Sequence, residues 1–94
     1  MKLFKTVDEK LAQIGFHKMA ENEAGVIYER IRNQPKFVQQ VFLMYKQNGK
    51  HIIQSYDRDL KDEKKVGNTC VGLTMYEATL FLKKMKQMGW EMIC

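Results

Sequence analysis

The segment 73–90 constrains the fold most, because it carries both a start and a stop signal for one helix. Thr74 and Glu77 form a capping box, in which the hydroxyl accepts from the amide of residue 77 and the carboxylate accepts from the amide of residue 74. Gly89 suits the left-handed position after a helix, with the following tryptophan folded back onto the last turn. We therefore predict a helix over residues 75–88.

One face of this predicted helix is apolar. Its members recur at spacings of three, four and three residues: Ala78, Phe81, Met85 and Met88. This spacing places them on one side of a helix. Because such a stripe is more often part of a core than of a binding site, we expect the rest of the chain to pack against it.

A shorter helix with the same start and stop signals is predicted over residues 6–16. Thr6 and Glu9 form a second capping box, and Gly15 is the stop residue, followed by Phe16. Its apolar stripe consists of Val7, Leu11 and Ile14. The two helices therefore deliver aromatic residues at their ends to a common core.

Strands are predicted between the helices, over residues 26–31, 37–45 and 51–56. Pro35 separates the first two, and Asn48-Gly49 predicts a two-residue type I′ turn between the last two. The polar residues before the first strand, 17–25, are predicted to be a connection. Residues 70–73 form a candidate edge strand ahead of the last helix.

The predicted turn sets the hairpin register, pairing Met44 with Ile53 and Val41 with Tyr56. One face of the sheet then carries Val38, Phe42, Met44, His51, Ile53 and Ser55. The other carries Phe37, Val41, Leu43, Tyr45, Ile52 and Tyr56. Both faces are more apolar than a half-exposed sheet requires. If two helices cover one face, the other is a candidate partner surface, for which we select Val38, Phe42, Met44 and Ile53. Coverage by loops or by the terminal segments is the alternative.

The expected fold is a single α+β domain over residues 1–94, in the order α-β-β-β-α. A three-stranded antiparallel sheet is packed on one face by the two helices. With 45% hydrophobic residues the chain can bury a modest core. It has no apolar run of about 18 residues, so we expect no membrane span. Cys70 and Cys94 lie in no metal or redox spacing, and no signal-peptide pattern is seen, which favours reduced thiols and the cytoplasm.

No pattern of catalytic or metal-binding residues is found. His17 and His51 have no carboxylate or cysteine at ligand spacing, and no nucleophile elbow surrounds Ser55. The charged segment 57–68 does not match a calcium loop: Lys61, Asp62 and Asn68 occupy the places of its acidic residue, its glycine and its bidentate glutamate. We predict no enzyme activity, no cofactor and no metal, and interpret this segment as a solvated loop of unknown purpose.

The net charge of +5 and the pI near 9.3 favour an acidic partner. The basic residues that are candidates for contacts with nucleic acid are Arg30, Arg32, Lys46, Lys50, Lys83, Lys84 and Lys86. Tyr28, Tyr45 and Tyr56 are interleaved with them, as in sheets that bind nucleic acid. Lysines that serve only solubility are the alternative.

The predicted order of elements is similar to that of the double-stranded-RNA-binding domain. In that family a histidine in the loop between the first two strands and lysines at the start of the last helix read the RNA. Here the loop over residues 32–36 has no histidine, and the lysines stand at the end of the helix. The resemblance therefore implies a topology and no function.

The chain also resembles small uncharacterised phage and prophage proteins of Gram-positive bacteria. The likeness lies in Gln13-Ile-Gly-Phe16, Glu21-Asn-Glu23, Ile27-Tyr-Glu29, Leu73-Thr-Met-Tyr-Glu77 and Met88-Gly-Trp90. Phe16 replaces a tyrosine of that group, and the charged segment is longer. The resemblance implies a phage-associated origin without an established activity, and it makes a host-directed interaction protein plausible.

Our leading hypothesis is a non-enzymatic interaction protein that acts through a protein-binding or self-association surface. Its partner is an unknown protein or a second copy. The alternative is a basic nucleic-acid-binding module.

Overall fold

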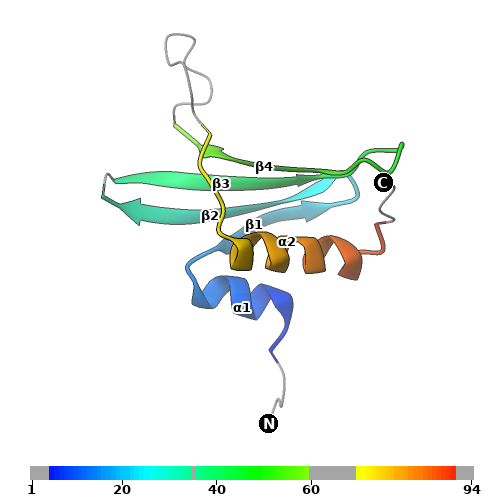
Figure 1. Ribbon diagram of the computed structural model, residues 1–94, viewed down its shortest axis with the longest axis horizontal. Helices are drawn as coiled ribbons and strands as arrows, with labels where there is room; N and C mark the ends of the chain where they lie inside the picture. Colours follow the sequence, from blue (N-terminus) through cyan, green and yellow to red (C-terminus); the bar gives the residue numbers. More distant parts are fainter. Residues whose placement is uncertain (1–4, 35, 60–69, 91–94) are drawn as a thin grey trace.

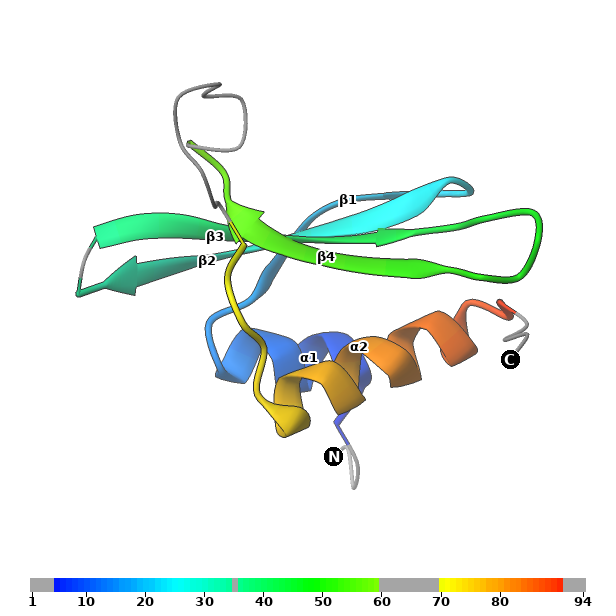
Figure 2. The same ribbon diagram turned by 45° about the horizontal axis from the view of Figure 1, so that its top comes forward.

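A computed structural model describes residues 5–34, 36–59 and 70–90. The elements are α1 (Val7–Gln13), β1 (His17–Asn22), β2 (Gly25–Asn33), β3 (Lys36–Met44), β4 (Ile52–Asp57) and α2 (Met75–Gln87). They form two layers, a four-stranded antiparallel sheet in the order β1-β2-β3-β4 and two helices on one of its faces (Figures 1 and 2). The α+β class and the antiparallel sheet are confirmed, whereas the expected number of three strands is wrong.

Both ends of α2 follow from the local sequence. The amide of Glu77 donates to the Thr74 hydroxyl at 3.1 Å, and the Thr74 amide donates to the Glu77 carboxylate at 2.9 Å, which completes the capping box. Gly89 has a φ of +81°, and the Trp90 amide reaches back to the Met85 carbonyl at 3.2 Å. This is the helix end that a glycine in the left-handed region produces.

The shorter helix α1 ends in the same way. The Thr6 hydroxyl accepts from the Glu9 amide at 3.1 Å. Gly15 has a φ of +95°, and the amide of Phe16 donates to the carbonyl of Leu11 at 2.9 Å. Phe16 is thereby turned into the core.

Strand β1 corrects the prediction of a polar connection over residues 17–25. All six residues of β1 are exposed, so its sequence lacks the alternation by which a half-buried strand is recognised. A bulge between Lys18 and Ala20 interrupts its pairing with β2. The Asn22 side chain accepts from the amides of Ala24 and Gly25, at 2.8 and 3.1 Å, and so closes the turn into β2.

The register of the β3–β4 hairpin differs by one residue from the prediction. Met44 pairs with Ile52 and Leu43 with Ile53, because the connection is longer than two residues. Within it the Gly49 amide donates to the Lys46 carbonyl at 3.0 Å, and His51 Nδ1 accepts from the Lys46 amide at 3.0 Å. A shift of one residue moves every β4 side chain to the opposite face.

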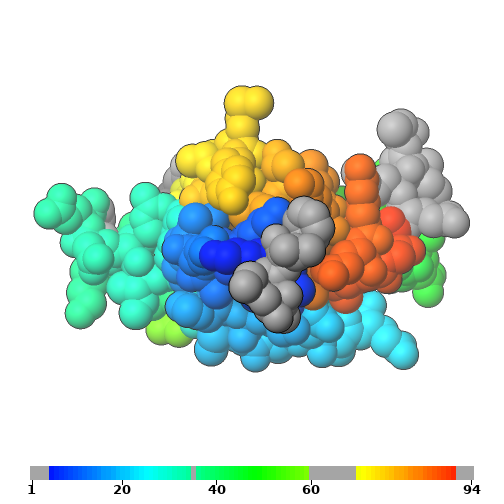
Figure 3. All heavy atoms as spheres, turned by 90° about the horizontal axis from the view of Figure 1, so that it is seen from below, coloured from blue at the N-terminus to red at the C-terminus, as the bar shows by residue number. Residues whose placement is uncertain are grey.

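The core lies between the sheet and the helices, which sit side by side over that face (Figure 3). Its buried members are Leu11, Phe16, Val26, Tyr28, Val41, Leu43, Leu80, Phe81, Met85 and Trp90. The Phe81 ring lies 5.2 Å from that of Phe16 and 5.4 Å from that of Tyr28. The apolar stripe of the last helix is therefore core, as expected. No helix in the described part of the chain has the length and apolar character to cross a membrane.

Candidate interaction surface

The sheet face turned away from both helices, which we call the open face, carries alternate residues of β2, β3 and β4 (Figure 2). Cross-strand pairing places Ile27 level with Phe42, and Phe42 level with Gln54. The apolar members are Ile27, Ile31, Val38, Phe42, Met44 and Ile52. The polar members are Glu29, Gln40, Gln54 and Tyr56.

A row of polar side chains crosses the open face from β2 to β4. The Tyr56 hydroxyl donates to the Gln40 side-chain oxygen, and Gln40 Nε2 donates to the Glu29 carboxylate at 2.7 Å. Arg58 donates to the other Glu29 oxygen at 3.1 Å. Tyr56 and Gln40 are each only 9% exposed, although no helix covers this face. These groups already bond one another. They therefore keep these hydrogen bonds when a partner covers the row and excludes water.

Apolar side chains lie on both sides of this row. Towards the β3–β4 connection they are Ile27, Phe42, Met44 and Ile52, and towards the β2–β3 turn they are Ile31 and Val38. Ile31 is 65% exposed and Ile52 is 37% exposed. These two groups of apolar side chains form the candidate interaction surface.

A groove of about 720 Å³ continues the open face around the edge of β4. Phe42, Met44 and Tyr56 line it from the sheet, and Val71 and Leu73 line it from the segment that leads to α2. This segment touches β4 through one bridge, between Tyr56 and Cys70, and through the Val71 amide, which donates to the Ser55 carbonyl at 3.0 Å. The predicted edge strand over residues 70–73 is thus reduced to a single bridge.

Three of the four predicted partner-surface residues, Val38, Phe42 and Met44, lie on the open face. Ile53 lies on the other side of the sheet, because the one-residue change of register turns it towards the helices, where it packs against the core. It still lines the groove at the edge of β4 together with Phe42 and Met44. The same change brings Ile52 and Tyr56 onto the open face. Ile27 and Ile31 were not selected, although their period-two spacing with Glu29 is visible in the sequence.

Arg30, a predicted nucleic-acid contact, is instead held inside the protein. Its guanidinium donates to Glu77 at 2.7 Å and to Gln39 at 2.9 Å, and it stacks 4.1 Å from the centre of the Phe16 ring. Burial acts to raise the pKa of Glu77, but the Thr74 amide and the Arg30 guanidinium together hold that pKa below its usual value. Arg30 therefore joins the sheet to α2 and does not present its charge to solvent.

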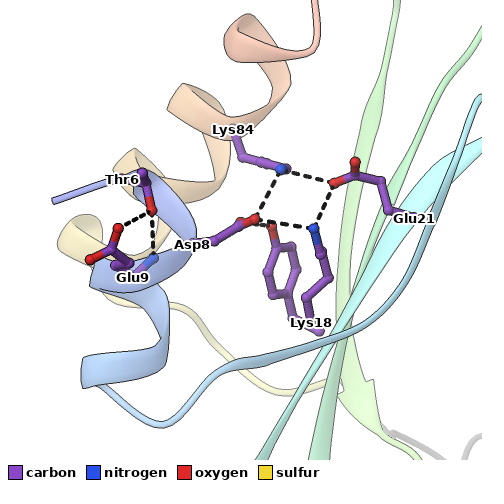
Figure 4. A network of polar contacts seen from close by, with 7 residues as sticks. Thr6, Asp8, Glu9, Lys18, Glu21 and Lys84 are labelled. Carbon is purple, nitrogen blue, oxygen red and sulfur yellow. Dashed lines mark hydrogen bonds and ion pairs between the residues drawn. The ribbon is translucent and has the colours of Figure 1, made fainter.

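Lys84, a second predicted contact, lies in a network of charges between the layers (Figure 4). Its ammonium is 3.2 Å from Asp8 and 2.9 Å from Glu21, and Lys18 lies 3.3 Å from the same two carboxylates. The Tyr28 hydroxyl donates to Asp8 at 2.6 Å. The network joins α2 to α1 and to strands β1 and β2.

These contacts change the pKa values of the groups in the network. Burial acts to raise the pKa of Asp8, but hydrogen bonds from Tyr28, Lys84 and Lys18 outweigh it and lower the pKa. A hydrogen bond from Lys84 lowers the pKa of Glu21. Burial first, and then the Asp8 carboxylate, raise the pKa of Tyr28, so this phenol stays protonated. The network therefore joins the helices to the sheet through ion pairs between charged side chains.

The other predicted basic contacts are exposed. Arg32 donates to Gln39 at 3.1 Å. The β3–β4 connection carries Lys46 and Lys50, and the second half of α2 carries Lys83 and Lys86. This connection and the C-terminal end of α2 lie at the same end of the molecule (Figures 1 and 2), where the Trp90 ring is 5.5 Å from Tyr45 and 5.1 Å from His51. We call Lys46, Lys50, Lys83, Lys86 and Tyr45 the lysine end.

In comparisons with known proteins, no protein-family model matches the chain, and neither a curated protein nor a solved structure matches it. The resemblance to phage proteins therefore stays a prediction.

Proposed function

We propose that this chain is a small non-enzymatic interaction protein that acts through its open face. The observation that supports this most is the polar row, whose members Glu29, Gln40 and Tyr56 bond to one another between two apolar patches. A nucleic-acid surface needs donors that are free for phosphates. Here those groups are engaged, and apolar side chains supply the remaining surface.

The partial burial of the apolar side chains suits reversible association. Burial of apolar surface contributes roughly 25 cal/mol per Å², and only the surplus over the cost of association appears as affinity. Phe42 and Met44 are half-buried within the sheet, so a partner gains less from them than from fully exposed side chains. We therefore expect a partner of moderate affinity. With the resemblance to phage proteins, the proposal points to a bacterial protein in the cytoplasm of a host cell.

Replacing Phe42 with lysine tests this proposal. The charge would stand in the middle of the open face, so we expect Phe42→Lys to abolish binding and self-association while circular dichroism shows an intact fold. Met75→Lys is the matched control, because Met75 is 89% exposed on α2, away from the open face. We would compare the size of each protein and the set of proteins that each retains from a Gram-positive bacterial extract.

Two results of that comparison decide the outcome. Proteins retained by wild type and by Met75→Lys, but lost from Phe42→Lys, support the proposal. If Phe42→Lys behaves as wild type in both size and binding, the open face is not the interaction surface.

The lysine end supports a second candidate function, nucleic-acid binding. Lys46 and Lys50 flank Tyr45, which is 44% exposed, and the lysines of α2 lie at the same end. Basic residues around an accessible aromatic ring suit a single strand, whose bases stack while its phosphates pair with lysines.

Fluorescence-anisotropy titration against single- and double-stranded DNA and RNA tests this second candidate. At about 50 and 200 mM salt the affinity for duplex DNA should fall by about 0.9 log units per log unit of salt for each phosphate neutralised. The double variant Lys46→Gln/Lys50→Gln should reduce that slope, whereas Lys36→Gln, at the far end of β3, should not. Absence of binding at either salt concentration would exclude the candidate.

A further inference from the structure

The open face is nearly neutral, although the chain carries a net charge of +5. At the central positions of β2, β3 and β4 its one charged side chain is Glu29, which Arg58 neutralises at 3.1 Å. Lys36 stands outside this area, at the β2–β3 end of the sheet. Two copies can therefore meet through this face without bringing like charges into contact. Like charges in contact across an interface would cost several kcal/mol.

The face is also large enough for a dimer. Strands β2 and β3 are nine residues long, and β1 and β4 are six. With strands about 4.8 Å apart and a rise of about 3.3 Å per residue, the complete four-stranded sheet of each copy, including the end that carries Lys36, has an area of roughly 500 Å². Two copies then bury on the order of 1,000 Å², which is the lower limit for a specific interface. Because such an interface is small, we expect a reversible dimer.

The second half of strand β3, residues 41–44, is apolar on both faces of the sheet, whereas Gln39 and Gln40 occupy the middle of the strand. Val41 and Leu43 are fully buried against the helices, and Phe42 and Met44 alternate with them on the open face. Such continuous apolar runs are typical of strands covered on both sides. A sheet from a second copy packs on such a face at about 10 Å, with the strand directions about 30° apart.

We infer that a second copy of this chain covers the open face, so that two sheets pack face to face with the helices outside. This inference rests on the proposed function of the open face and names its partner. In a two-fold dimer the same patch serves both copies. Phe42, on an inner strand and level with Ile27 and Gln54, lies near the two-fold axis.

Sedimentation equilibrium tests the dimer. Over about 1 to 300 µM, the range that a small interface implies, the mass of wild type should rise from 11.1 kDa towards twice that value. Phe42→Lys and Phe42→Glu should each stay monomeric, because like charges meet at the axis. An equimolar mixture of the two should form a mixed dimer. Met75→Lys, on the outer side of α2, should assemble as wild type.

A wild-type mass of 11.1 kDa over the whole range would overturn the inference. So would Phe42→Lys and Phe42→Glu if each alone assembled as wild type, since the dimer would then use another surface. If the Phe42 variants fail to fold, Ile52→Lys and Ile52→Glu take their place, because Ile52 is exposed on the same face.

The same variants separate this inference from the proposed function. A monomeric wild type that retains a bacterial protein in a Phe42-dependent manner would keep the open face as the interaction surface and would overturn only the second copy. A monomeric wild type whose binding does not respond to Phe42→Lys would overturn both.

Discussion

Arg30 links the sheet to α2 and to the segment that follows α1, through its contacts with Gln39, Glu77 and Phe16. Its side chain is 14% exposed and that of Glu77 is 10% exposed. When one partner of a buried pair is removed, the other is left as an uncompensated charge, at a cost of about 3 kcal/mol or more. We therefore expect Arg30→Met to lower the free energy of unfolding in urea by about 3 kcal/mol.

The double variant Arg30→Met/Glu77→Gln is the control for this explanation. A glutamine still accepts from the Thr74 amide, as capping boxes allow, but it leaves no buried charge. The double variant should therefore be more stable than Arg30→Met alone. A double variant that is less stable than the single one would show that the loss comes from packing.

Acid should destabilise the protein through Asp8, Glu21 and Glu77, whose pKa values are all lowered in the folded state. Their usual values are 3.8 for Asp8 and 4.5 for the two glutamates. The unfolded state binds protons first as the pH falls, so the stabilisation is complete above the usual values and is lost through the lowered ones. We expect a melting temperature that is constant above about pH 5 and declines below about pH 4.5.

The variant Asp8→Asn measures how much of this decline in melting temperature is due to Asp8. Asp8 contacts Lys84, Lys18 and Tyr28 only as an acceptor, so its ionised form carries the stabilisation. The variant should be less stable than wild type at pH 7, and the difference should shrink as the pH is lowered. Parallel melting curves over the whole pH range would contradict this role.

At the scale of elements, Gly15 and Gly89 end the two helices with φ values of +95° and +81°. Gly89→Ala meets no neighbouring atom within 4 Å, so it should cost only the strain of the left-handed backbone, about 1 kcal/mol. In Gly15→Ala the new Cβ would also lie 3.1 Å from Cδ of Arg30, so the loss should be larger.

Gly72→Ala is the matched control for the two helix ends. Gly72 has no φ in the left-handed range and no atom within 4 Å of a Cβ, so we expect a change near zero or a slight gain. Urea unfolding measures all three variants. A loss for Gly72→Ala equal to that for Gly89→Ala would show that strain at the helix end is not the cause.

The helices were predictable because their signals are local. Thr74, Glu77 and Gly89 bond to backbone groups within a few residues, so no knowledge of tertiary contacts is needed. Strand β1 was not predictable in this way, since all its side chains are exposed and its existence depends on pairing with β2.

The candidate site was predictable on β3 but not on β4. Val38, Phe42 and Met44 share a face whatever the hairpin register is, because alternation along one strand places them there. The face of Ile53 depends on the length of the connection, in which the His51 ring bonds the Lys46 amide. The sequence preference of Asn-Gly for two-residue turns takes no account of the His51 side chain. The predicted register of the β3–β4 hairpin was therefore wrong by one residue.

At the scale of the whole molecule, polar contacts of two kinds lie on the two faces of the sheet and have different roles. The Arg30 and Lys84 ion pairs lie between the layers and hold the helices on the sheet. The row of Glu29, Gln40 and Tyr56 lies on the other side of the sheet and bonds mainly within itself. The helix-covered face thus holds the two layers together, and the open face is the surface through which we propose that a partner binds.

Hydroxyl-radical oxidation of methionines tests whether the open face is the interaction surface. Met44 lies on the open face, and Met75 is 89% exposed on α2, so the two report on opposite sides of one molecule. We would measure their oxidation rates by mass spectrometry in dilute protein, in concentrated protein and in bacterial extract. We predict that Met44 becomes protected in concentrated protein or in extract, while Met75 reacts at an unchanged rate. Unchanged oxidation of Met44 in all three samples would contradict the claim that the open face is the interaction surface.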